Sequence, residues 1–366
     1  MCSLKLDTSK YDFHSLENKY NGFGVPAFKI MIEGKDVVQK EHMGIGEIVV
    51  ETSINKADIF SFSVINAYEM DKSQFKWTDD YFVVGKKVEI KIGYIDKFFT
   101  VFDGYITSVK YESIKGEGPA VVVSGMDSSF LMMKGRKSFI WTKKKHSDIV
   151  SEIAKKYKLK TEVSSTDIEF ETVIQNHQTD YDFLNYLADI NSYEVFVIGS
   201  TLYFRELNSD QSSALTLELN RNLIEFSYTM DLAEQIGEVI VRGYNDKKEE
   251  IEAKANSIDK LGNGDKDGVS LLRGIDKTNT IHYIYEPVIS KKEAEDRAKS
   301  ILAKRAMNFV FGEGVSIGIP EIMAGRYISI KGLWGTKTRL FYITSTIHSI
   351  NDNGFNTYFK VGGNAI

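Results

Sequence analysis

Cysteine, proline and long apolar runs are scarce in this chain of 366 residues. The single cysteine, Cys2, cannot form an intrachain disulfide or supply the several ligands of a structural zinc site. Folding in a reducing cytoplasm is therefore expected. The four prolines exclude a proline-rich linker or stalk. No run approaches the roughly 18 apolar residues of a membrane span, and residues 1–10 lack the apolar core of a signal peptide.

Charge of one sign is lacking as well. The chain has 46 Lys and Arg against 51 Asp and Glu, a net charge of −5, so no basic field favours specific nucleic-acid binding. Hydrophobic residues make up 42% and charged residues 27%, which is typical of a folded globular protein and excludes disorder. Aromatic residues reach 12%, with 22 Phe and 19 Tyr, and this composition favours strands. The length suggests two or three domains.

Alternation of apolar and polar residues predicts strands throughout the first third of the chain. Phe60, Phe62 and Val64 alternate with serines and Ile65, and residues 88–94 show the same period of two. The strands expected here are 28–32, 48–51, 60–65, 88–94, 98–103, 105–111 and 120–124. Short strands with long connections fit an antiparallel barrel or sandwich.

The middle third has the pattern of a mixed α/β unit. Apolar residues at helical spacing predict a helix over 149–157, for which Ser147 and Asp148 supply a cap and a first-turn charge. A second helix is expected to begin after Thr179, because Thr179-x-x-Asp182 resembles a capping box. Two strands, 194–198 and 202–205, follow and are joined by a tight turn.

Strand patterns resume in the last third, around one further helix. Ser290-x-x-Glu293 is a capping box that predicts a helix at about 290–308. The charged, glycine-rich segment 247–280 indicates a mobile loop or a long hairpin extension. The strands expected here are 224–229, 238–242, 326–331, 339–350 and 355–361. No repeat is visible as identical residues at a fixed period.

One segment resembles a calcium site. Asn263, Asp265 and Asp267 with Gly268 match the first half of an EF-hand loop. The twelfth position is Gly274 instead of a bidentate glutamate, and no amphipathic helix flanks the loop. An ordinary turn explains the same residues and is favoured, because Asn, Asp and Gly tolerate left-handed backbone conformations.

The other polar motifs assign no chemistry. The histidines, none of them at metal-ligand spacing from another, are His14, His42, His146, His177, His282 and His348. We expect His348, which lies in a strand pattern, to be a hydrogen-bonded structural residue. Motifs that lack the companions needed for catalysis or phosphate binding are Ser73-x-x-Lys76, Gly44-x-Gly46 and Asp79-Asp80.

A single basic cluster, 143–145 with Lys134 and Arg136, could contact a phosphate backbone or an acidic partner. A solvated loop is the default interpretation. The sequence therefore assigns no catalytic, cofactor-binding or metal-binding residue, and no cofactor is expected.

The order of several longer segments is more specific. Residues 141–160 and 174–198, in particular Gln178-Thr-Asp-Tyr-Asp-Phe-Leu184, together with 238–244 and the stretch from 293 to 359, resemble the hub family of contractile injection machines. That family includes the phage late control gene D proteins, the baseplate hubs of contractile-tailed phages and the hub part of type VI secretion VgrG spikes. The resemblance covers most of the chain and is weakest over 1–45 and 247–280.

The resemblance implies a β-rich α+β fold with two related tube-forming β-barrel domains and an α/β insertion domain between them. The domains expected are an N-terminal barrel at 1–125, the insertion at 126–232 and a second barrel at 233–366. The family also implies a homotrimer, in which three chains present six similar barrels to a six-fold tail tube and adapt it to a three-fold spike. No catalytic residue carries over, and the chain is expected not to be an enzyme.

The expected partners are a central spike, tail tube or tube-initiator proteins and other baseplate components. VgrG proteins continue into an oligonucleotide/oligosaccharide-binding domain and a needle, whereas this sequence stops at Ile366, so the spike is expected to be a separate polypeptide. The protein is expected to be made and assembled in the bacterial cytoplasm, as a component of a virion tail or an extracellular injection particle. Phages, tailocins and toxin-delivery particles all fit, and membrane insertion is not expected.

Two alternative functions remain open from the residues. A tail-associated peptidoglycan hydrolase would need convergent carboxylates or a metal cluster, and zymography on cell-wall material would reveal it. A carbohydrate- or receptor-binding tail protein would use exposed aromatic residues on a β scaffold, and its melting temperature would rise with the sugar.

Overall fold

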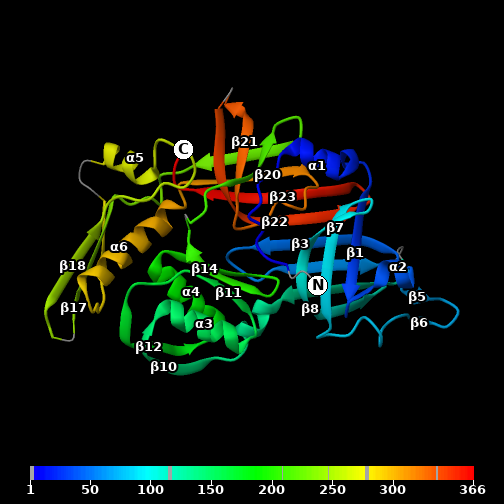
Figure 1. The fold of residues 1–366 in the computed structure, drawn as a ribbon, viewed down its shortest axis with the longest axis horizontal. Helices are drawn as coiled ribbons and strands as arrows, with labels where there is room; N and C mark the ends of the chain where they lie inside the picture. The colour runs from blue at the N-terminus through cyan, green and yellow to red at the C-terminus, as the bar shows by residue number, and fades with distance from the viewer. Residues whose placement is uncertain (1–3, 114–117, 208, 246, 277–279, 335–336) are drawn as a thin grey trace.

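Strands dominate the fold, which confirms the β-rich expectation. The computed structural model describes residues 4–113, 118–207, 209–245, 247–276, 280–334 and 337–366. Cys2 lies outside the described residues. Figure 1 shows the strands of the first third on one side, the last strands across the top, the middle third below and a small α/β unit on the opposite side.

Thirteen strands of the described chain form one large sheet. The first third of the chain contributes β1 (Pro26–Ile32), β2 (Lys35–Asp36), β3 (Ile45–Ser53), β4 (Ile59–Val64), β7 (Lys87–Tyr94), β8 (Lys97–Glu112) and β9 (Ala120–Asp127). The rest are β15 (Ser213–Glu218), β16 (Leu223–Met230), β20 (Val310–Ile317), β21 (Tyr327–Trp334), β22 (Lys337–Asn351) and β23 (Gly354–Gly363). Their order is β16-β20-β23-β22-β3-β4-β9-β8-β7-β1-β2, with β21 on β22 and β15 on β21.

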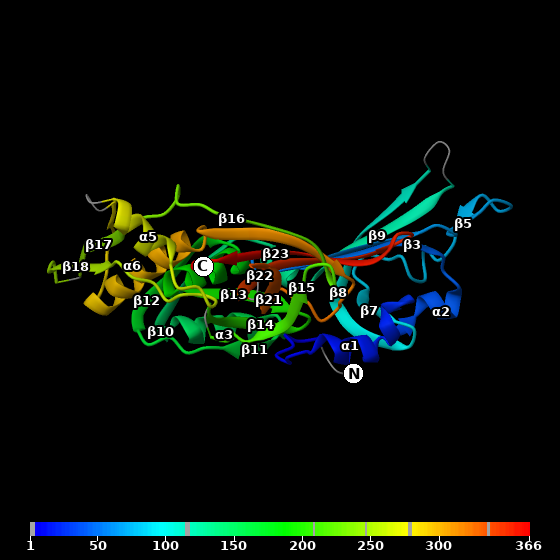
Figure 2. The ribbon, with the colours of Figure 1, turned by 90° about the horizontal axis from the view of Figure 1, so that it is seen from above.

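The long strand β22 joins the first and last thirds of the chain. Its first half pairs with β21, and its second half pairs on that same side with β3, in the register Ser345–Ser53 to Ile350–Ile48. Its other edge pairs with β23. The two ends of the sequence therefore share one hydrogen-bonded sheet, which Figure 2 shows as strands running along the molecule, with β8 and β9 rising from it at one end.

The strand order occurs twice in this sheet. Strands β3-β4-β9-β8-β7-β1 follow one another in space in the same way as β16-β20-β23-β22-β21-β15. Each set also runs through the chain in the same sequence, from β1 and β3 to β9 and from β15 and β16 to β23. One difference is that β1 pairs antiparallel with β7, whereas β15 pairs parallel with β21.

A local motif marks the repeat. The N–H of Gly85 donates to the carbonyl of Ile106 at 2.8 Å, and the N–H of Gly325 donates to the carbonyl of Ile343 at 2.9 Å. Both glycines have a positive φ, 90° and 82°, which a side chain would strain. In both β8 and β22 the chain then reads Tyr-Ile-Thr-Ser, with a register shift directly after the isoleucine. Both units therefore contain the same hydrogen bond from a glycine to the neighbouring strand and the same β-bulge after the isoleucine.

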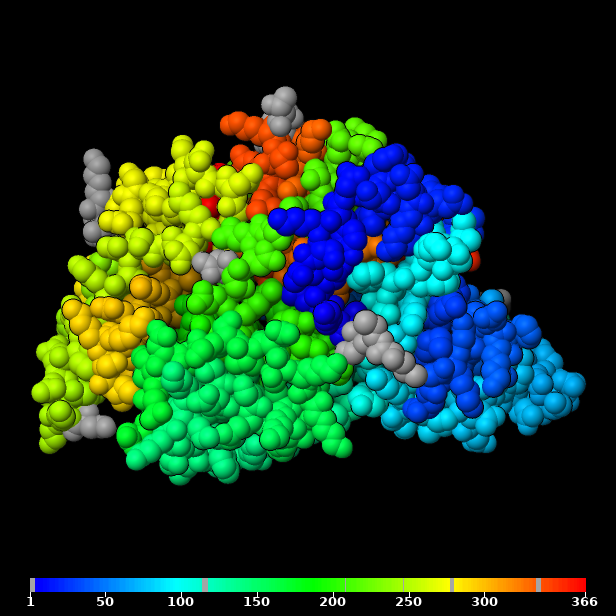
Figure 3. Space-filling view, viewed as in Figure 1, coloured from blue at the N-terminus to red at the C-terminus, as the bar shows by residue number. Residues whose placement is uncertain are grey.

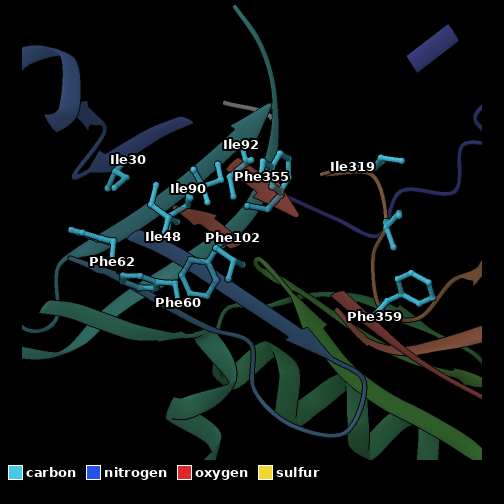
Figure 4. Close-up of a cluster of buried hydrophobic side chains, with 14 of the residues drawn as sticks. Ile30, Ile48, Phe60, Phe62, Ile90, Ile92, Phe102, Ile319, Phe355 and Phe359 are labelled. Carbon is cyan, nitrogen blue, oxygen red and sulfur yellow. The ribbon is translucent and has the colours of Figure 1, made fainter. Parts of the chain in front are cut away.

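The inward side chains of this sheet form the largest hydrophobic core. Phe60, Phe62 and Phe102 are almost fully buried there, together with Ile48 and Ile90 (Figure 4). The rings of Phe60 and Phe102 meet edge to face at 4.8 Å. Burial of each such side chain contributes about 1.5–3 kcal/mol to folding. A slip of one residue would turn all of them to the solvent, so the alternation of apolar and polar residues determines which face of the sheet is buried.

The middle third packs around its own core. Its elements are β10 (Lys137–Lys145), α3 (His146–Lys156), β11 (Lys160–Val163), β12 (Glu169–Gln178), α4 (Asp180–Asn191), β13 (Tyr193–Ile198) and β14 (Thr201–Glu206). The Thr179 cap is confirmed, since its hydroxyl accepts from the N–H of Asp182 at 3.0 Å. The Ser147 cap is wrong. Ser147 lies inside α3 and its side chain accepts from the N–H of Thr166 at 3.2 Å.

A second small α/β unit lies between β16 and β20. It contains β17 (Glu238–Tyr244), β18 (Glu250–Ala255), α5 (Gly268–Ile275), β19 (Ile281–Tyr285) and α6 (Lys291–Ala306). The α6 helix is confirmed. The Ser290 hydroxyl accepts from the N–H of Glu293 at 3.2 Å, and the Glu293 carboxylate accepts from the N–H of Ile289 at 2.7 Å. The segment 247–280 is expected from the sequence to be a mobile loop or a long hairpin extension. It contains β18, which forms an antiparallel hairpin with β17, and also the helix α5; its residues 277–279 lie outside the described chain.

The strand pairing differs from the expected division at residue 232. Strands β15 and β16 lie within the range expected for the insertion, yet they pair with β21 and β20 of the large sheet. The α/β unit with α6 lies within the range expected for the second barrel and has its own three-stranded sheet and core. The remaining short elements are α1 (Phe13–Lys19), η1 (Asn21–Phe23), α2 (Val37–Glu41), β5 (Tyr68–Glu69), β6 (Gln74–Phe75) and η2 (Ser128–Met133).

Candidate assembly surface

The outward face of the large sheet carries a row of small side chains that are all polar except Val49. Neighbours in register across six strands, all half-exposed or exposed, are Asn356, Ser349, Val49, Ser61, Ser124 and Ser108. The adjacent row is larger and more apolar, and consists of Tyr358, Ile347, Glu51, Ile59, Met126 and Tyr105. Since antiparallel sheets with one buried face alternate in this way, this face is available to solvent or to a partner.

Two edges of the same sheet have a partner on one side only. Strand β16 ends the sheet and pairs only with β20 within the described residues. The last part of β8 pairs with β9 on one side, while its pairing with β7 stops near Ile106. Side chains at these edges are exposed, with Met230 at 48% and Tyr111 at 43%. Unpaired strand edges are templates for pairing with another chain.

A buried ion pair holds the middle third against the large sheet. The Nε of Arg205 donates to Oε1 of Glu194 at 2.7 Å, and its Nη2 donates to the carbonyl of Gly325 at 2.6 Å. The Tyr342 hydroxyl donates to the other oxygen of Glu194. Burial raises the pKa of the Glu194 carboxyl, and the Arg205 guanidinium opposes that rise. This contact therefore fixes β13 and β14 relative to β22.

Two buried carboxyl groups lie where β9 leaves the large sheet. Oδ2 of Asp127 accepts from the N–H of Asp58 at 2.9 Å, and Oδ1 of Asp58 accepts from the N–H of Ser53 at 2.9 Å. Burial raises the pKa of Asp58 well above its ordinary value, and the charge of Asp127 adds to the rise. Burial also raises the pKa of Asp127 to about 6. We therefore expect the stability of this junction to depend on pH.

A third polar contact attaches α1 to the loop before β21. Buried Glu321 accepts from the Nζ of Lys19 at 2.7 Å and from the hydroxyl of Tyr20 at 2.6 Å. The hydroxyl of Tyr94 donates to the carbonyl of Gly318 at 2.8 Å. The N-terminal segment is thus tied to the last third, and the junctions between the units are polar and specific.

The structure assigns other partners to the calcium candidate. The Asn263 side chain donates to the carbonyl of Thr338 at 2.8 Å and accepts from the N–H of Leu340 at 2.9 Å. Asp267 caps α5, accepting from the N–H of Ser270 at 2.8 Å. Among the described residues, no group of three His, Cys, Asp or Glu side chains could hold a metal ion. The turn interpretation accounts for these residues.

The expected structural role of His348 is confirmed. Its Nδ1 lies 3.0 Å from the Thr357 hydroxyl, and burial lowers its pKa to about 4. A second buried histidine, His146, stacks on Phe170 at 4.3 Å with its Nδ1 2.9 Å from Nδ2 of Asn191. No sequence pattern singles out His146, because its partners Phe170 and Asn191 lie far along the chain.

The other sequence candidates lie apart on the surface. In the basic cluster, Lys144 forms an ion pair with Glu152 at 2.5 Å, as expected for a solvated surface. Ser73 is exposed in a left-handed turn, and Lys76 covers the ring of Trp77 at 4.4 Å. Neither arrangement brings a nucleophile beside a base.

A hollow in the surface lies beside the N-terminal segment. It has a volume of about 750 Å³ and lies between residues 4–9, the start of β8 and the strands β11 and β14. The carboxylate of Asp7 in it already accepts from the N–H of Ser9 at 2.9 Å and from the Tyr11 hydroxyl. In the part of the chain that is described, no helix is both long enough and apolar enough to span a bilayer. The space-filling view shows the units packed side by side (Figure 3).

Several solved tail proteins have a similar fold. The 43 kDa tail protein of prophage MuSo2 from Shewanella oneidensis aligns with a TM-score of 0.69 and 14% identity, over 92% of this chain and 98% of that one. A tail protein from Neisseria meningitidis MC58 aligns with a TM-score of 0.69 and 12% identity, over 92% and 96%. These likenesses confirm the fold of a phage tail protein.

The E. coli c3393 protein, described as a component of the type VI secretion system with structural similarity to the T4 tail proteins gp27 and gp5, aligns with a TM-score of 0.53 and 11% identity, over 91% of this chain and 76% of that one. No curated protein matches the sequence. A family model described as the Alg8 N-terminal domain matches residues 23–352, which is most of the chain. The chain therefore belongs to the Alg8 N-terminal domain family.

Proposed function

We propose that this chain is a structural baseplate hub protein of a contractile phage tail or a related injection particle, as its resemblance to the late control gene D and VgrG hub proteins suggests. Three copies form a ring that adapts the six-fold tail tube to the three-fold spike. The observation that carries the proposal is the strand order that occurs twice in one sheet. Because each chain supplies two similar units side by side, three chains supply the six that a six-fold tube requires.

In this proposal the two tube-like units are β1–β9 and β15–β16 with β20–β23. The α/β units between β9 and β15 and between β16 and β20 project from the ring. This division refines the boundaries at 125 and 232, because β15 and β16 pair within the large sheet. The folds shared with the tail proteins and with the type VI secretion component support a place in such an assembly.

The outward sheet face lines the lumen of the ring in this arrangement. Its row of small polar side chains, including Ser61, Ser124 and Ser349, offers a water-compatible strip along the wall, beside the larger and more apolar row. The polar junction at Glu194 keeps the projecting unit between β9 and β15 in a fixed position under load, and the one at Glu321 ties the N-terminal segment to the second tube-like unit. The function is thus symmetry matching and load bearing, without catalysis.

The partners follow from this position. The tube or its initiator stacks on one side of the ring, a spike docks on the other, and further baseplate components contact the projecting units. The protein is made and assembled in the bacterial cytoplasm and then becomes part of a virion tail or an extracellular particle.

Light scattering of the purified chain, with and without its spike protein, tests the proposal. The expected species is a trimer with three times the chain mass of 41.5 kDa, which end-on electron microscopy shows as a ring with six-fold features. A monomer that persists at high concentration and in the presence of the spike contradicts the hub function.

A further inference from the structure

The two repeated units of the sheet meet at one junction within the chain. The strands that are equivalent to the two junction strands, but lie in the opposite units, have no such partner in the described chain. Strand β22 of the second unit pairs with β3 of the first. The equivalent strands of the opposite units are β8 and β16, and both have an edge without a strand partner in the described chain. We propose that β8 of one copy pairs antiparallel with β16 of the next, in the register that β22 and β3 have within the chain. This inference rests on the ring of the proposed function.

The equivalence of β8 and β22 is fixed by the bulge motif. Tyr105-Ile-Thr-Ser108 corresponds to Tyr342-Ile-Thr-Ser345, with the same hydrogen bonds to the strand before and the same register shift after the isoleucine. Counting on from the two serines, Val109 corresponds to Thr346 and Lys110 to Ile347.

The equivalence of β16 and β3 follows by stepping across the sheet from the two tyrosines. In the first unit the cross-strand neighbours are Tyr105, Met126, Ile59 and Glu51. In the second unit they are Tyr342, Gly362, Phe311 and Thr229. Thr229 therefore corresponds to Glu51, and Met230 to Thr52.

The internal junction then predicts the register between copies. Within the chain, Ile347 lies opposite Glu51 and Thr346 opposite Thr52. Between copies, Lys110 therefore lies opposite Thr229 and Val109 opposite Met230. Continuity of one sheet across chains gives each β8–β16 contact the same geometry as the established β22–β3 contact.

The side chains at the two edges suit this pairing. The internal pair is buried and polar, with the hydroxyls of Thr52 and Thr346 2.7 Å apart. At the equivalent place, half-buried Val109 and 48% exposed Met230 form an apolar pair that association would remove from water. A second copy is favoured over a foreign strand because the two edges are complementary ends of one repeated sheet. Such a head-to-tail contact closes into a ring when its rotation allows.

Paired cysteines in a Cys2→Ser chain test the register. Lys110→Cys with Thr229→Cys is expected to form interchain disulfides under mild oxidation, because opposed residues of an antiparallel pair have Cα atoms about 4.5–5.5 Å apart. Glu51→Cys with Ile347→Cys, the internal equivalents, serves as the intrachain positive control. Lys110→Cys with Glu225→Cys is four residues out of register, about 13 Å along the strand, and should not cross-link.

The gel and the native mass separate the outcomes. A ladder of linked chains that ends at three, given only by the in-register pair, supports the proposal. A trimer by light scattering without this ladder, or equal linking by the out-of-register pair or by Lys110→Cys alone, overturns the β8–β16 pairing and leaves the proposed ring standing. A persistent monomer without cross-links overturns both.

A charge at the edge gives an independent readout. Met230→Glu is expected to raise the concentration needed for trimer formation about tenfold or more, since it places a carboxylate where an apolar pair should form. Ile174→Glu is the matched control, because Ile174 is 56% exposed and lies on β12, away from both edges. Equal effects of the two substitutions contradict the proposal.

Discussion

The Arg205 ion pair gives the most quantitative test of how the middle third is held. Its two side chains are only 16% and 7% exposed, for Arg205 and Glu194 respectively. Arg205→Met preserves the apolar stem and removes the charge, which leaves the Glu194 carboxylate buried without a cation. Breaking a buried pair in this way costs about 3–5 kcal/mol of the free energy of unfolding.

The cost depends on pH in a predictable direction. Burial already raises the pKa of Glu194, and loss of the guanidinium raises it further, so the folded variant binds a proton that the unfolded chain releases. The stability of Arg205→Met is therefore greatest at low pH and is lost as the pH rises through the folded-state pKa of Glu194. The deficit should be larger at pH 8 than at pH 5.

A second substitution should recover much of the loss. Glu194→Gln with Arg205→Met removes the uncompensated charge, while the amide oxygen can still accept from the Tyr342 hydroxyl. Urea unfolding of the single and double variants at both pH values measures the coupling. Arg242→Met is the control, because its pair with Glu252 is exposed and is screened by solvent. A double variant as unstable as the sum of the singles would refute the reasoning.

Three further predictions concern pH and backbone conformation. Asp58→Asn should stabilise the chain at pH 8 and make little difference at pH 4 in chemical denaturation, because the raised pKa of Asp58 means that folding stability is lost as the pH rises; an equal effect at both values contradicts this. Because burial lowers the pKa of His348 to about 4, the free energy of unfolding should fall by about 3 kcal/mol as the pH falls from about 6.5 to about 4. His348→Gln should lack this loss when unfolding is followed across that range. Gly85→Ala should lower the free energy of unfolding by about 1–2 kcal/mol because of its positive φ alone. Gly325→Ala should lower it more, because its Cβ would also lie 3.2 Å from a buried ring. Gly118→Ala is the control, and equal melting temperatures for all three variants would be evidence against the strain.

Local patterns predicted local structure well. The caps at Thr179 and Ser290 could be read from the sequence because each hydroxyl bonds an N–H three residues ahead. Strand alternation identified the buried faces for the same reason. Where a distant residue competes, the prediction was wrong: Ser147 pairs with Thr166 instead of capping α3.

The assembly surface could not be read from the sequence in the same way. Its polar row draws single residues from six strands of both ends of the chain, so no segment of the sequence displays it. The calcium motif misleads for the converse reason. Asn263 is near the two aspartates in sequence, but its side chain is used by β22, far along the chain. The register of the sheet brings the residues of the polar row together, and the contact of Asn263 with β22 separates it from the role that the calcium motif suggests.

The repeated strand order could not be recognised from the sequence, because large and small side chains occupy different strands in the two units. In the first unit, Phe62 on β4 lies between Ile48 on β3 and Val123 on β9. In the second unit the same three positions are Gly314, Phe226 and Phe359.

The large residue has moved from the central strand to its two neighbours. A Cβ on Gly314 would lie 2.5 Å from Cζ of Phe359 and 2.9 Å from Cδ2 of Phe226, so the glycine is required by the rings that fill its space. Core packing constrains the total volume at a place in the sheet and not the identity of each residue. What the copies must share is backbone geometry, and it is there, at Gly85 and Gly325 and at the bulge after each Tyr-Ile, that the repeat persists as identical residues.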